Sequence, residues 1–306
     1  MVGQKLPLLR DLQIAAKSGF LRGSSTDSGK DKMAYQFDRG RIYRMPTHFG
    51  PAPGPRQVPS NVAADPTRSP QKTLITASFL TEASALETHT PEHFQLAGEP
   101  VVTIEFHYMT HIDWLAGRGY TMIQLWWPVT FNGERDRVTG RFLAVMWENL
   151  ADPIITGRGE VGQPKLFAEI PDSRFTDGTY HCAASWMGFQ FLEVRVSEAS
   201  EPDAPPLQQQ ALEGTLMLKY VPRTGEWGEP EVCQVTYTPT ATPDLTVEWS
   251  RPATGTVAFR RAGWSDLPTM CHIVNALADL PVLATRGASI ARTRGGKSYR
   301  DTRILK

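Results

Sequence analysis

The sequence has little of what marks several protein classes. Only three cysteines occur among its 306 residues, and they have no CxxC spacing, so neither a disulfide framework nor a zinc knuckle is predicted. The formal net charge is zero, which gives no reason to expect nucleic acid as a partner. No stretch approaches about 18 uninterrupted apolar residues, and charged residues interrupt the N-terminal apolar stretches. We therefore expect a cytoplasmic protein with neither a membrane span nor a signal peptide.

Lysine is also scarce, because residues 33–296 contain only Lys72, Lys165 and Lys219. Lys165 follows a glycine-punctuated stretch and precedes Leu-Phe-Ala. An amine kept among apolar groups loses the solvation of its charged form, so its pKa falls and the neutral amine can attack a carbonyl to form a Schiff base. The alternative is a lysine at a strand edge whose head group reaches water.

The stretch before Lys165 also contains a misleading motif. Gly157, Gly159 and Gly162 spell GxGxxG, which binds a dinucleotide when it follows a strand and opens a helix. Pro164 comes two residues after the last glycine and Pro171 closes the next run, leaving no room for that helix. We interpret the stretch as a turn, and we expect no nucleotide cofactor.

The rest of the chain has the pattern of a β protein. Turn residues separate runs rich in β-branched and aromatic side chains, which predict strands. The expected strands are Leu74–Phe79, Val101–Tyr108, Tyr120–Phe131, Arg141–Trp147, Lys165–Ile170, Tyr180–Val196, Gly214–Tyr220, Glu231–Tyr237, Leu245–Trp249 and Thr256–Arg260. Helices are expected only at Thr81–Leu86 and Met270–Ala278. The fold class is therefore mainly β (α+β), and we expect a closed antiparallel β-barrel with a few accessory helices.

Three regions follow from composition. Residues 1–32 show helical spacing of leucines before a Gly/Ser-rich run, which indicates an N-terminal arm. Residues 33–72 are rich in proline and are expected to run extended over the surface. Residues 73–306 form the barrel domain. An arm of this kind is suited to docking on a second subunit, so we expect a homo-oligomer, although a frayed terminus is an equal alternative.

One predicted strand carries an unusually polar face. Glu105, His107 and His111 share one side of an extended segment. Histidine and carboxylate are good metal ligands, but the two histidines are about 13 Å apart along a strand. We therefore expect no metal here, and interpret the face as one that hydrogen-bonds substrate or water.

Several blocks, in the expected order, resemble the acetoacetate decarboxylase family across roughly residues 70–290. They are Glu99–Glu105, Pro128–Gly133, Ile154–Arg158 with Gln163–Lys165, Leu218–Pro222 and Ala278–Val282. The resemblance implies that Lys165 is the Schiff-base lysine of that family and that Glu105 matches a family carboxylate. It also implies a substrate-binding arginine near the first strand, for which Arg68 is the candidate.

The same comparison shows departures. The family's second lysine, directly after the first, is Leu166 here, and a family glutamate is replaced by Met122. Burial beside Leu166 and Phe167, with Trp126 and Trp127 as pocket walls, is expected to lower the lysine pKa instead. Further candidates for substrate contact are Glu160 in the glycine-rich stretch and two residues of the proline-rich segment, His48 and Arg56.

We therefore expect a lyase that acts on a small keto acid or ketone, of the decarboxylase type but with a substrate other than acetoacetate. Aldol cleavage and dehydration share the same imine and stay open as alternatives. A barrel that merely binds a carboxylate ligand, with Lys165 as its cation, is the competing class. The chemistry requires no cofactor.

The arm hypothesis makes a testable prediction. Deleting residues 1–32 should lower the mass of the oligomer in sedimentation, because a docking contact is lost, while circular dichroism of the β domain stays unchanged. An unchanged mass would show that the arm makes no contribution to assembly.

Overall fold

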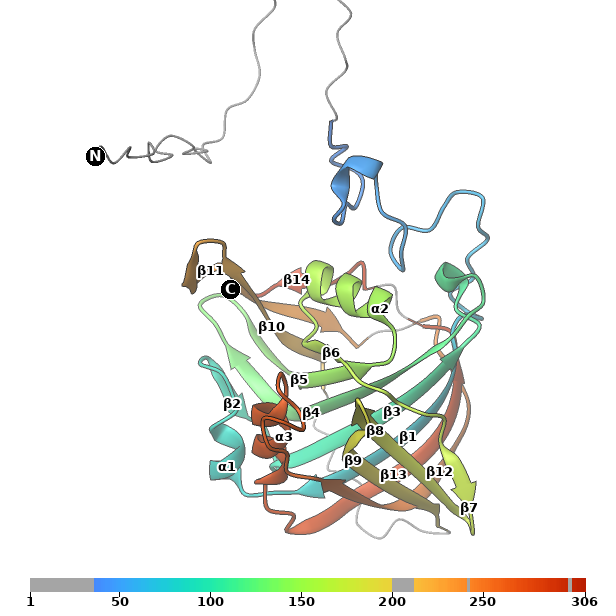
Figure 1. Ribbon diagram of the computed structural model, residues 1–306, viewed down its shortest axis with the longest axis vertical. Helices are drawn as coiled ribbons and strands as arrows, with labels where there is room; N and C mark the ends of the chain where they lie inside the picture. The colour runs from blue at the N-terminus through green and yellow to red at the C-terminus, as the bar shows by residue number, and fades with distance from the viewer. Residues whose placement is uncertain (1–35, 200–211, 241–242, 297–298) are drawn as a thin grey trace, which may run out of the picture. The chain divides into compact units, whose positions relative to one another are not determined.

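Runs of alternating β-branched and aromatic residues make a single large sheet (Figure 1). The computed structural model describes residues 36–199, 212–240, 243–296 and 299–306. Residues 41–306 form one compact unit, separate from residues 1–40. The predicted arm at 1–32 lies outside the described residues. No helix in the described part is long and apolar enough to cross a membrane.

The strands agree with the predicted runs in most places. They are β1 (Gln71–Leu80), β2 (Phe94–Leu96), β3 (Val101–Thr110), β4 (Tyr120–Asn132), β5 (Arg137–Glu148), β6 (Lys165–Phe167), β7 (Arg174–Thr176), β8 (Thr179–Trp186), β9 (Phe189–Glu198), β10 (Gly214–Arg223), β11 (Glu226–Pro239), β12 (Thr246–Phe259), β13 (Ala284–Arg294) and β14 (Arg303–Ile304). β2, β7, β13 and β14 have no predicted counterpart, and β12 joins the predicted runs Leu245–Trp249 and Thr256–Arg260. The predicted run Tyr180–Val196 is a hairpin. It turns at Met187 and Gly188, whose φ angles of 46° and 86° suit a tight reversal.

Helices are few, as predicted. Those of the described residues are α1 (Ala83–Glu87), α2 (Ala151–Thr156), α3 (Cys271–Ala278), two short 3₁₀ turns, η1 (Thr47–Phe49) and η2 (Asp113–Leu115), and one π-helical turn, η3 (Gly157–Val161). The glycine-rich stretch, interpreted above as a turn, is therefore helical. Gly157 continues α2 into η3, and the helix ends at Gly162 with a φ of 81°. A π turn is rare and is frequently found at functional sites.

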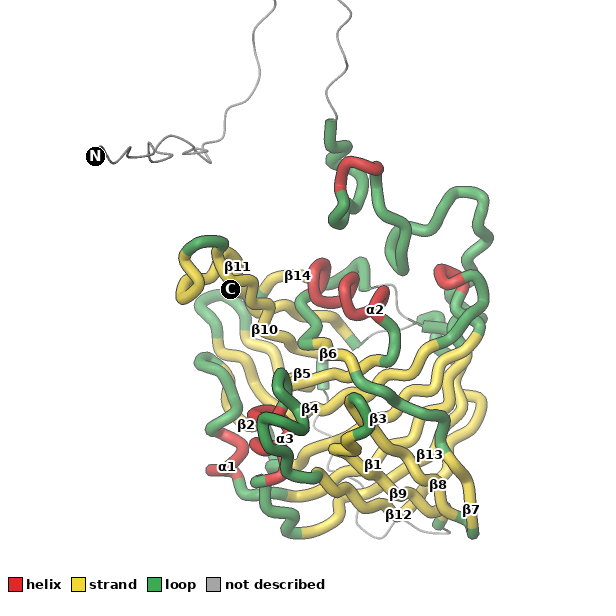
Figure 2. The backbone as a smooth tube through the Cα atoms, viewed as in Figure 1, coloured by secondary structure: helices red, strands yellow, loops and turns green. Residues whose placement is uncertain are grey.

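The prediction of a closed barrel is wrong. The sheet follows the order β14-β11-β10-β5-β4-β3-β1-β13-β12-β9-β8-β7, and its two end strands do not pair with each other in the described part of the chain. Nor is it wholly antiparallel, since β5 pairs in parallel with both β6 and β10. Figure 2 shows the resulting curved, open sheet. Alternation along each strand predicts its faces but not its neighbours, so closure was not determined by the pattern.

The proline-rich segment is irregular instead of extended. It contains η1 and an isolated bridge between Gly54 and Gln57. Side chains brace it, since Arg44 Nη1 donates to the carbonyl of Pro53 at 2.8 Å and Gln57 Nε2 donates to that of Ala52 at 2.8 Å.

The two faces of the central strands serve different purposes. Ile123, Leu125 and Trp127 of β4 point into the main core, whereas Met122 and Trp126 belong to a smaller apolar cluster on the other face. A bulge after Leu125 adjusts the register with β5. The smaller cluster lies on the side of the sheet where the polar side chains described below gather.

The main core predicts a stability effect. Phe191 is completely buried and packs against Trp147 with ring centroids 5.3 Å apart. Phe191→Ala should lower the free energy of unfolding by about 3–5 kcal/mol, because it leaves a cavity. Phe175, which is 56% exposed, is the matched control. Phe175→Ala should cost much less in urea unfolding, and equal losses would contradict this account of the core.

Candidate active site

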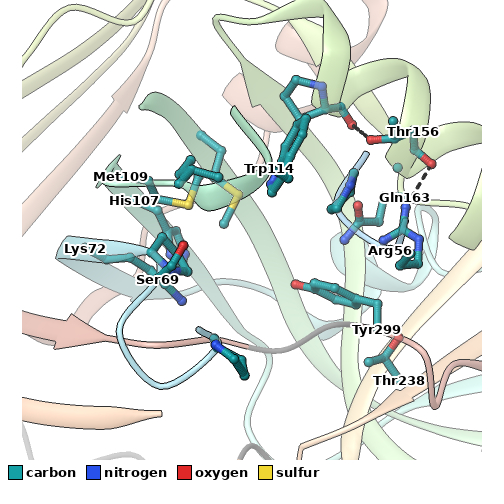
Figure 3. Close-up of a pocket in the computed structure, with 18 of the residues that line it drawn as sticks. Arg56, Ser69, Lys72, His107, Met109, Trp114, Thr156, Gln163, Thr238 and Tyr299 are labelled. Atoms are coloured by element: carbon teal, nitrogen blue, oxygen red, sulfur yellow. Dashed lines mark hydrogen bonds between the residues drawn. The ribbon is translucent and has the colours of Figure 1, made fainter. Parts of the chain in front are cut away.

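A cavity of about 570 Å³ lies on the face of β3, β4 and β5 that carries the smaller apolar cluster. Its polar lining includes Arg56, Ser69, Lys72, Glu105, His107, Tyr120, Arg141, Thr156, Gln163, Lys165 and Tyr299. Its apolar lining includes Met109, Ile112, Trp114 and Met122. Figure 3 shows Lys72, Ser69 and His107 on one side, with Arg56, Gln163 and Tyr299 on the other.

Lys165 is held at this cavity by β6. That strand pairs in parallel with the end of β5, and the carbonyl of Pro164 accepts a hydrogen bond from Met146 N. The Lys165 side chain is only 6% exposed. Its Nζ donates to the carbonyl of Pro153 at 3.0 Å and lies 2.8 Å from Glu148 Oε1. The lysine therefore does not reach water as a strand-edge lysine would.

Gly157 is what makes room for the amine. A Cβ atom built at this position would lie 2.6 Å from Lys165 Nζ and 2.5 Å from Gln163 Oε1. Real Cβ contacts do not come so close, so a side chain here would displace the amine. Of the three glycines in the GxGxxG motif, this one serves the packing of the lysine, not a phosphate.

Glu148 is the carboxylate in contact with Lys165, and sequence reasoning missed it. It is the last residue of β5, has no exposed surface, and stands directly opposite Met122 of β4. Directly opposed residues have Cβ atoms roughly 4.5–5.5 Å apart. A carboxylate therefore lies one strand away from Met122, the position at which the family resemblance implies a glutamate. The signal was a lone glutamate ending an apolar strand, which becomes meaningful only when β4 and β5 are paired.

Burial and mutual attraction shift the pKa values of Lys165 and Glu148 in opposite directions. Burial lowers the pKa of Lys165, and the nearby carboxylate of Glu148 only partly opposes this. Burial also raises the pKa of Glu148, against the effect of the lysine. The two pKa values move toward each other, so the pair is poised to pass a proton from the ammonium to the carboxylate. That transfer leaves the neutral amine that attacks carbonyl groups.

A second cluster lies on the polar face of β3. His107 Nε2 is 3.3 Å from Glu105 Oε2, and Arg141 of β5 is 3.6 Å from the other oxygen. Burial alone would raise the pKa of Glu105, but His107 and Arg141 outweigh it and lower the pKa to about 2. Lys72 lies nearby on β1, and burial lowers its pKa. No group of three or more metal-binding side chains occurs among the described residues.

The other predicted site residues are placed as follows. Met122 lines the cavity, and Trp126 lies beneath it with Arg141 stacked 4.8 Å over its ring. Glu160 pairs with Arg44 and Arg56. Arg68 and His48 are exposed and outside the cavity lining. Arg68 lies in the loop before β1, not on the strand.

Two expected sources of burial are replaced by others. Leu166 faces the opposite side of β6 and packs against the main core, and Phe167 is 46% exposed. Trp127 also belongs to the main core. The amine of Lys165 is covered instead by the turn from Pro153 to Gly157. Neighbours in a strand point to opposite faces, so Leu166 does not cover the amine of Lys165.

Comparisons with known proteins agree with this geometry. A model of the family described as acetoacetate decarboxylase matches residues 44–294. The chain belongs to the acetoacetate decarboxylase family. A curated acetoacetate decarboxylase from Clostridium botulinum is 27% identical over 185 residues, which cover 57% of this chain and 68% of that protein.

Solved structures share the fold of this acetoacetate decarboxylase family member. The acetoacetate decarboxylase of Legionella pneumophila has a TM-score of 0.58 at 20% identity, covering 83% of this chain and 92% of that one. The enduracididine biosynthesis enzyme MppR, complexed with pyruvate, has a TM-score of 0.55 at 16% identity, covering 78% and 89%. At such identities the likeness establishes the fold.

The coupled pair gives a testable prediction. Glu148→Gln removes a negative charge that raises the pKa of Lys165, so the pH midpoint for borohydride trapping of a ketone should move to lower pH. The maximal trapping rate should fall, because the proton acceptor beside the amine is lost. The control is Glu169, which is exposed and lies two residues after the end of β6. Glu169→Gln should leave both quantities unchanged, and a midpoint that rises in Glu148→Gln would contradict the coupling.

Proposed function

We propose that this protein is a Schiff-base-forming carbon–carbon lyase that acts on a keto acid, with Lys165 as the nucleophile. The observation that supports the proposal best is the buried contact of Lys165 Nζ with Glu148 Oε1 at 2.8 Å, at the wall of a cavity. A buried lysine paired this way is costly to maintain. It is suited to a reaction that needs a neutral amine at ordinary pH.

The first half of the reaction follows from the pair. Glu148 accepts the proton of the Lys165 ammonium, and the amine attacks the keto carbon to give a carbinolamine. Glu148 then returns that proton as the carbinolamine loses its hydroxyl group as water, which gives a protonated imine and restores the carboxylate. Glu148 is buried and does not line the cavity. Its role is therefore to exchange protons with the nitrogen of Lys165.

The second half uses the imine as an electron sink. The bond that breaks is the one to a carboxylate in a decarboxylation, or the one to a hydroxyl-bearing carbon in an aldol cleavage. In both cases its electron pair moves to the imine nitrogen and leaves an enamine. Protonation of the enamine at carbon and hydrolysis of the new imine release the product and restore Lys165.

The lining supports an acidic substrate larger than acetoacetate. Arg56, Lys72 and Arg141 supply positive charge around the cavity, and carboxylates pair well with such groups. Met109, Trp114 and Met122 provide an apolar wall for a substituent. The change of a family glutamate to Met122 places apolar surface where the family has a carboxylate, which favours a substrate with an apolar part.

The competing function is binding of a carboxylate ligand without chemistry. A cation used only for binding works best when it stays charged. The pKa of Lys165 is lowered by burial, which weakens it as a permanent cation and strengthens it as a nucleophile. This is why catalysis is favoured here.

The nucleophile can be tested directly. Borohydride reduction in the presence of pyruvate or acetone should attach the carbonyl compound irreversibly to Lys165, as located by peptide mass spectrometry. Lys165→Arg should abolish this labelling, because arginine keeps the charge but does not form the imine. The control is Lys219→Arg. Lys219 does not line the cavity, and its Nζ donates to the carbonyl of Gly159 at 2.7 Å. It should label like the unaltered protein.

Labelling that survives Lys165→Arg would remove the lysine from the mechanism. Retention of tight carboxylate binding by Lys165→Arg, with no labelling of the unaltered protein, would favour the binding function instead.

A further inference from the structure

A second cavity lies across β1 and β3 from the cavity that Lys165 lines, which is called the lysine cavity below. The second cavity has a volume of about 510 Å³ and is lined by Thr73, Tyr108, Asp172, Ser173, Tyr180, Glu248, Trp249 and Arg292. In β1, Thr73 lines this cavity and its neighbour Lys72 lines the lysine cavity. In β3, Tyr108 and His107 divide in the same way. Neighbours in a strand point to opposite faces, so the two strands form a wall between two separate sites.

One side of the second cavity is a row of side chains across four strands. Tyr108 of β3 is opposite Thr73 of β1, and Thr73 is opposite Arg292 of β13. Arg292 is in turn opposite Trp249 of β12. Paired strands lie about 4.8 Å apart, so this row is roughly 14 Å long. Opposed side chains share a face of the sheet, so the register places a phenol ring and an indole ring at the two ends of the row.

A β-bulge adds a carboxylate beside the indole. The register of β12 with β13 shifts between Val247 and Trp249, so Glu248 is an extra residue in β12. In a regular strand Glu248 and Trp249 would point to opposite faces, but both line the cavity. Bulges are over-represented next to active sites, where they re-aim a side chain. The bulge therefore gives this cavity a polar group that a regular strand would have turned away.

Arg292 is the cationic residue of the lining, and its guanidinium is already in use. Nη1 donates to Thr73 Oγ1 at 3.1 Å, and Nη2 donates to Gln71 Oε1 at 2.9 Å. Nε lies 3.8 Å from Glu248 Oε2. Glu248 is shared with Arg294, whose Nε is 3.5 Å from the other carboxylate oxygen. All three nitrogens of Arg292 thus face partners within the protein, which disfavours an anionic ligand.

The polar groups left for a ligand are mainly acceptors. Asp172 has no ion-pair partner among the described residues and lines the cavity. The hydroxyl of Tyr108 is buried and completes no hydrogen bond of good geometry within the same part of the chain, although Ser173 and Cys182 lie near it. A buried hydroxyl without a partner is costly, and a donor from a ligand would relieve that cost.

Aromatic rings form much of the remaining wall. Tyr108, Tyr180 and Trp249 all line the cavity. The ring of Trp249 already attracts a cation, because the guanidinium of Arg251 lies 5.0 Å from its centroid. The face of an aromatic ring is negative and attracts ammonium groups as well as guanidinium groups. Rings beside an unpaired carboxylate are therefore suited to a ligand that combines a positive charge with an apolar body.

We propose that this cavity binds a small organic ammonium ion, whose nitrogen contacts Asp172 and whose apolar body lies against Tyr180 and Trp249. An ammonium group donates up to three hydrogen bonds and accepts none. It thus matches a lining whose open groups are a carboxylate and hydroxyls. The site uses no residue of the lysine cavity, so it does not depend on the Schiff-base function.

Phenethylamine, which is positively charged at neutral pH, tests this site by isothermal titration calorimetry. Phenethyl alcohol has a similar shape without the charge and should bind at least about tenfold more weakly, because a hydrogen bond to a charged group is lost. Asp172→Asn should weaken binding of the amine about fivefold, since Asp172 is exposed and water screens the contact. Trp249→Leu keeps an apolar side chain without the ring face and should weaken binding about two- to fivefold.

Two matched variants locate the bound amine. Asp177→Asn removes the same charge from an exposed residue outside the lining, in the turn between β7 and β8. Trp114→Leu makes the same change as Trp249→Leu, but at the lysine cavity. Both variants should bind phenethylamine as the unaltered protein does.

Weaker binding in Asp172→Asn and Trp249→Leu, with neither control changed, would support the ammonium site. Equal affinities for the amine and the alcohol, an unchanged affinity in Asp172→Asn, or an amine that does not bind would overturn it. A loss of affinity in Trp114→Leu but not in Trp249→Leu would place the amine in the lysine cavity and would overturn the proposal as well.

Discussion

The buried contact between Lys165 and Glu148 is the constraint around which the site is arranged. Two opposite charges without surrounding water stay in a fold only if neighbouring elements hold them closely. Here the parallel pairing of β6 with β5 sets Lys165 opposite Met146, two residues before Glu148 on the same face of β5. Gly157 then lets the helical turn close over the amine. The cost of that burial appears as two pKa values that approach each other, which is the condition for a reactive amine.

The family resemblance and the departures from it are reconciled by the pairing of strands. Met122, where the resemblance implies a glutamate, is opposite Glu148, so a carboxylate is present on the adjacent strand. The position of the second lysine, Leu166, faces the main core. Arg56 is instead the cation whose charge, after burial, helps to lower the pKa of Lys165.

The proline-rich segment gains a role in this arrangement. Glu160 joins it to the helical turn that covers the lysine, through Arg44 and Arg56. Arg300, near the end of the chain, donates to the carbonyl of Arg56 at 2.9 Å. Three distant parts of the sequence therefore fix one guanidinium at the cavity.

The sequence by itself determined the lysine, the strands and the family. A lysine in an apolar setting and alternating residues are local patterns, and Glu105 with His107 follows from the two-residue period of a strand. Glu148 and the open sheet required tertiary structure, as did the finding that Arg56 and not His48 lines the cavity. Glu148 is 17 residues from Lys165 along the chain and Arg56 is 109 residues away, and no local periodicity links them. Strand pairing and the placement of the loop before β1 bring them together, because each depends on which distant backbone groups find one another.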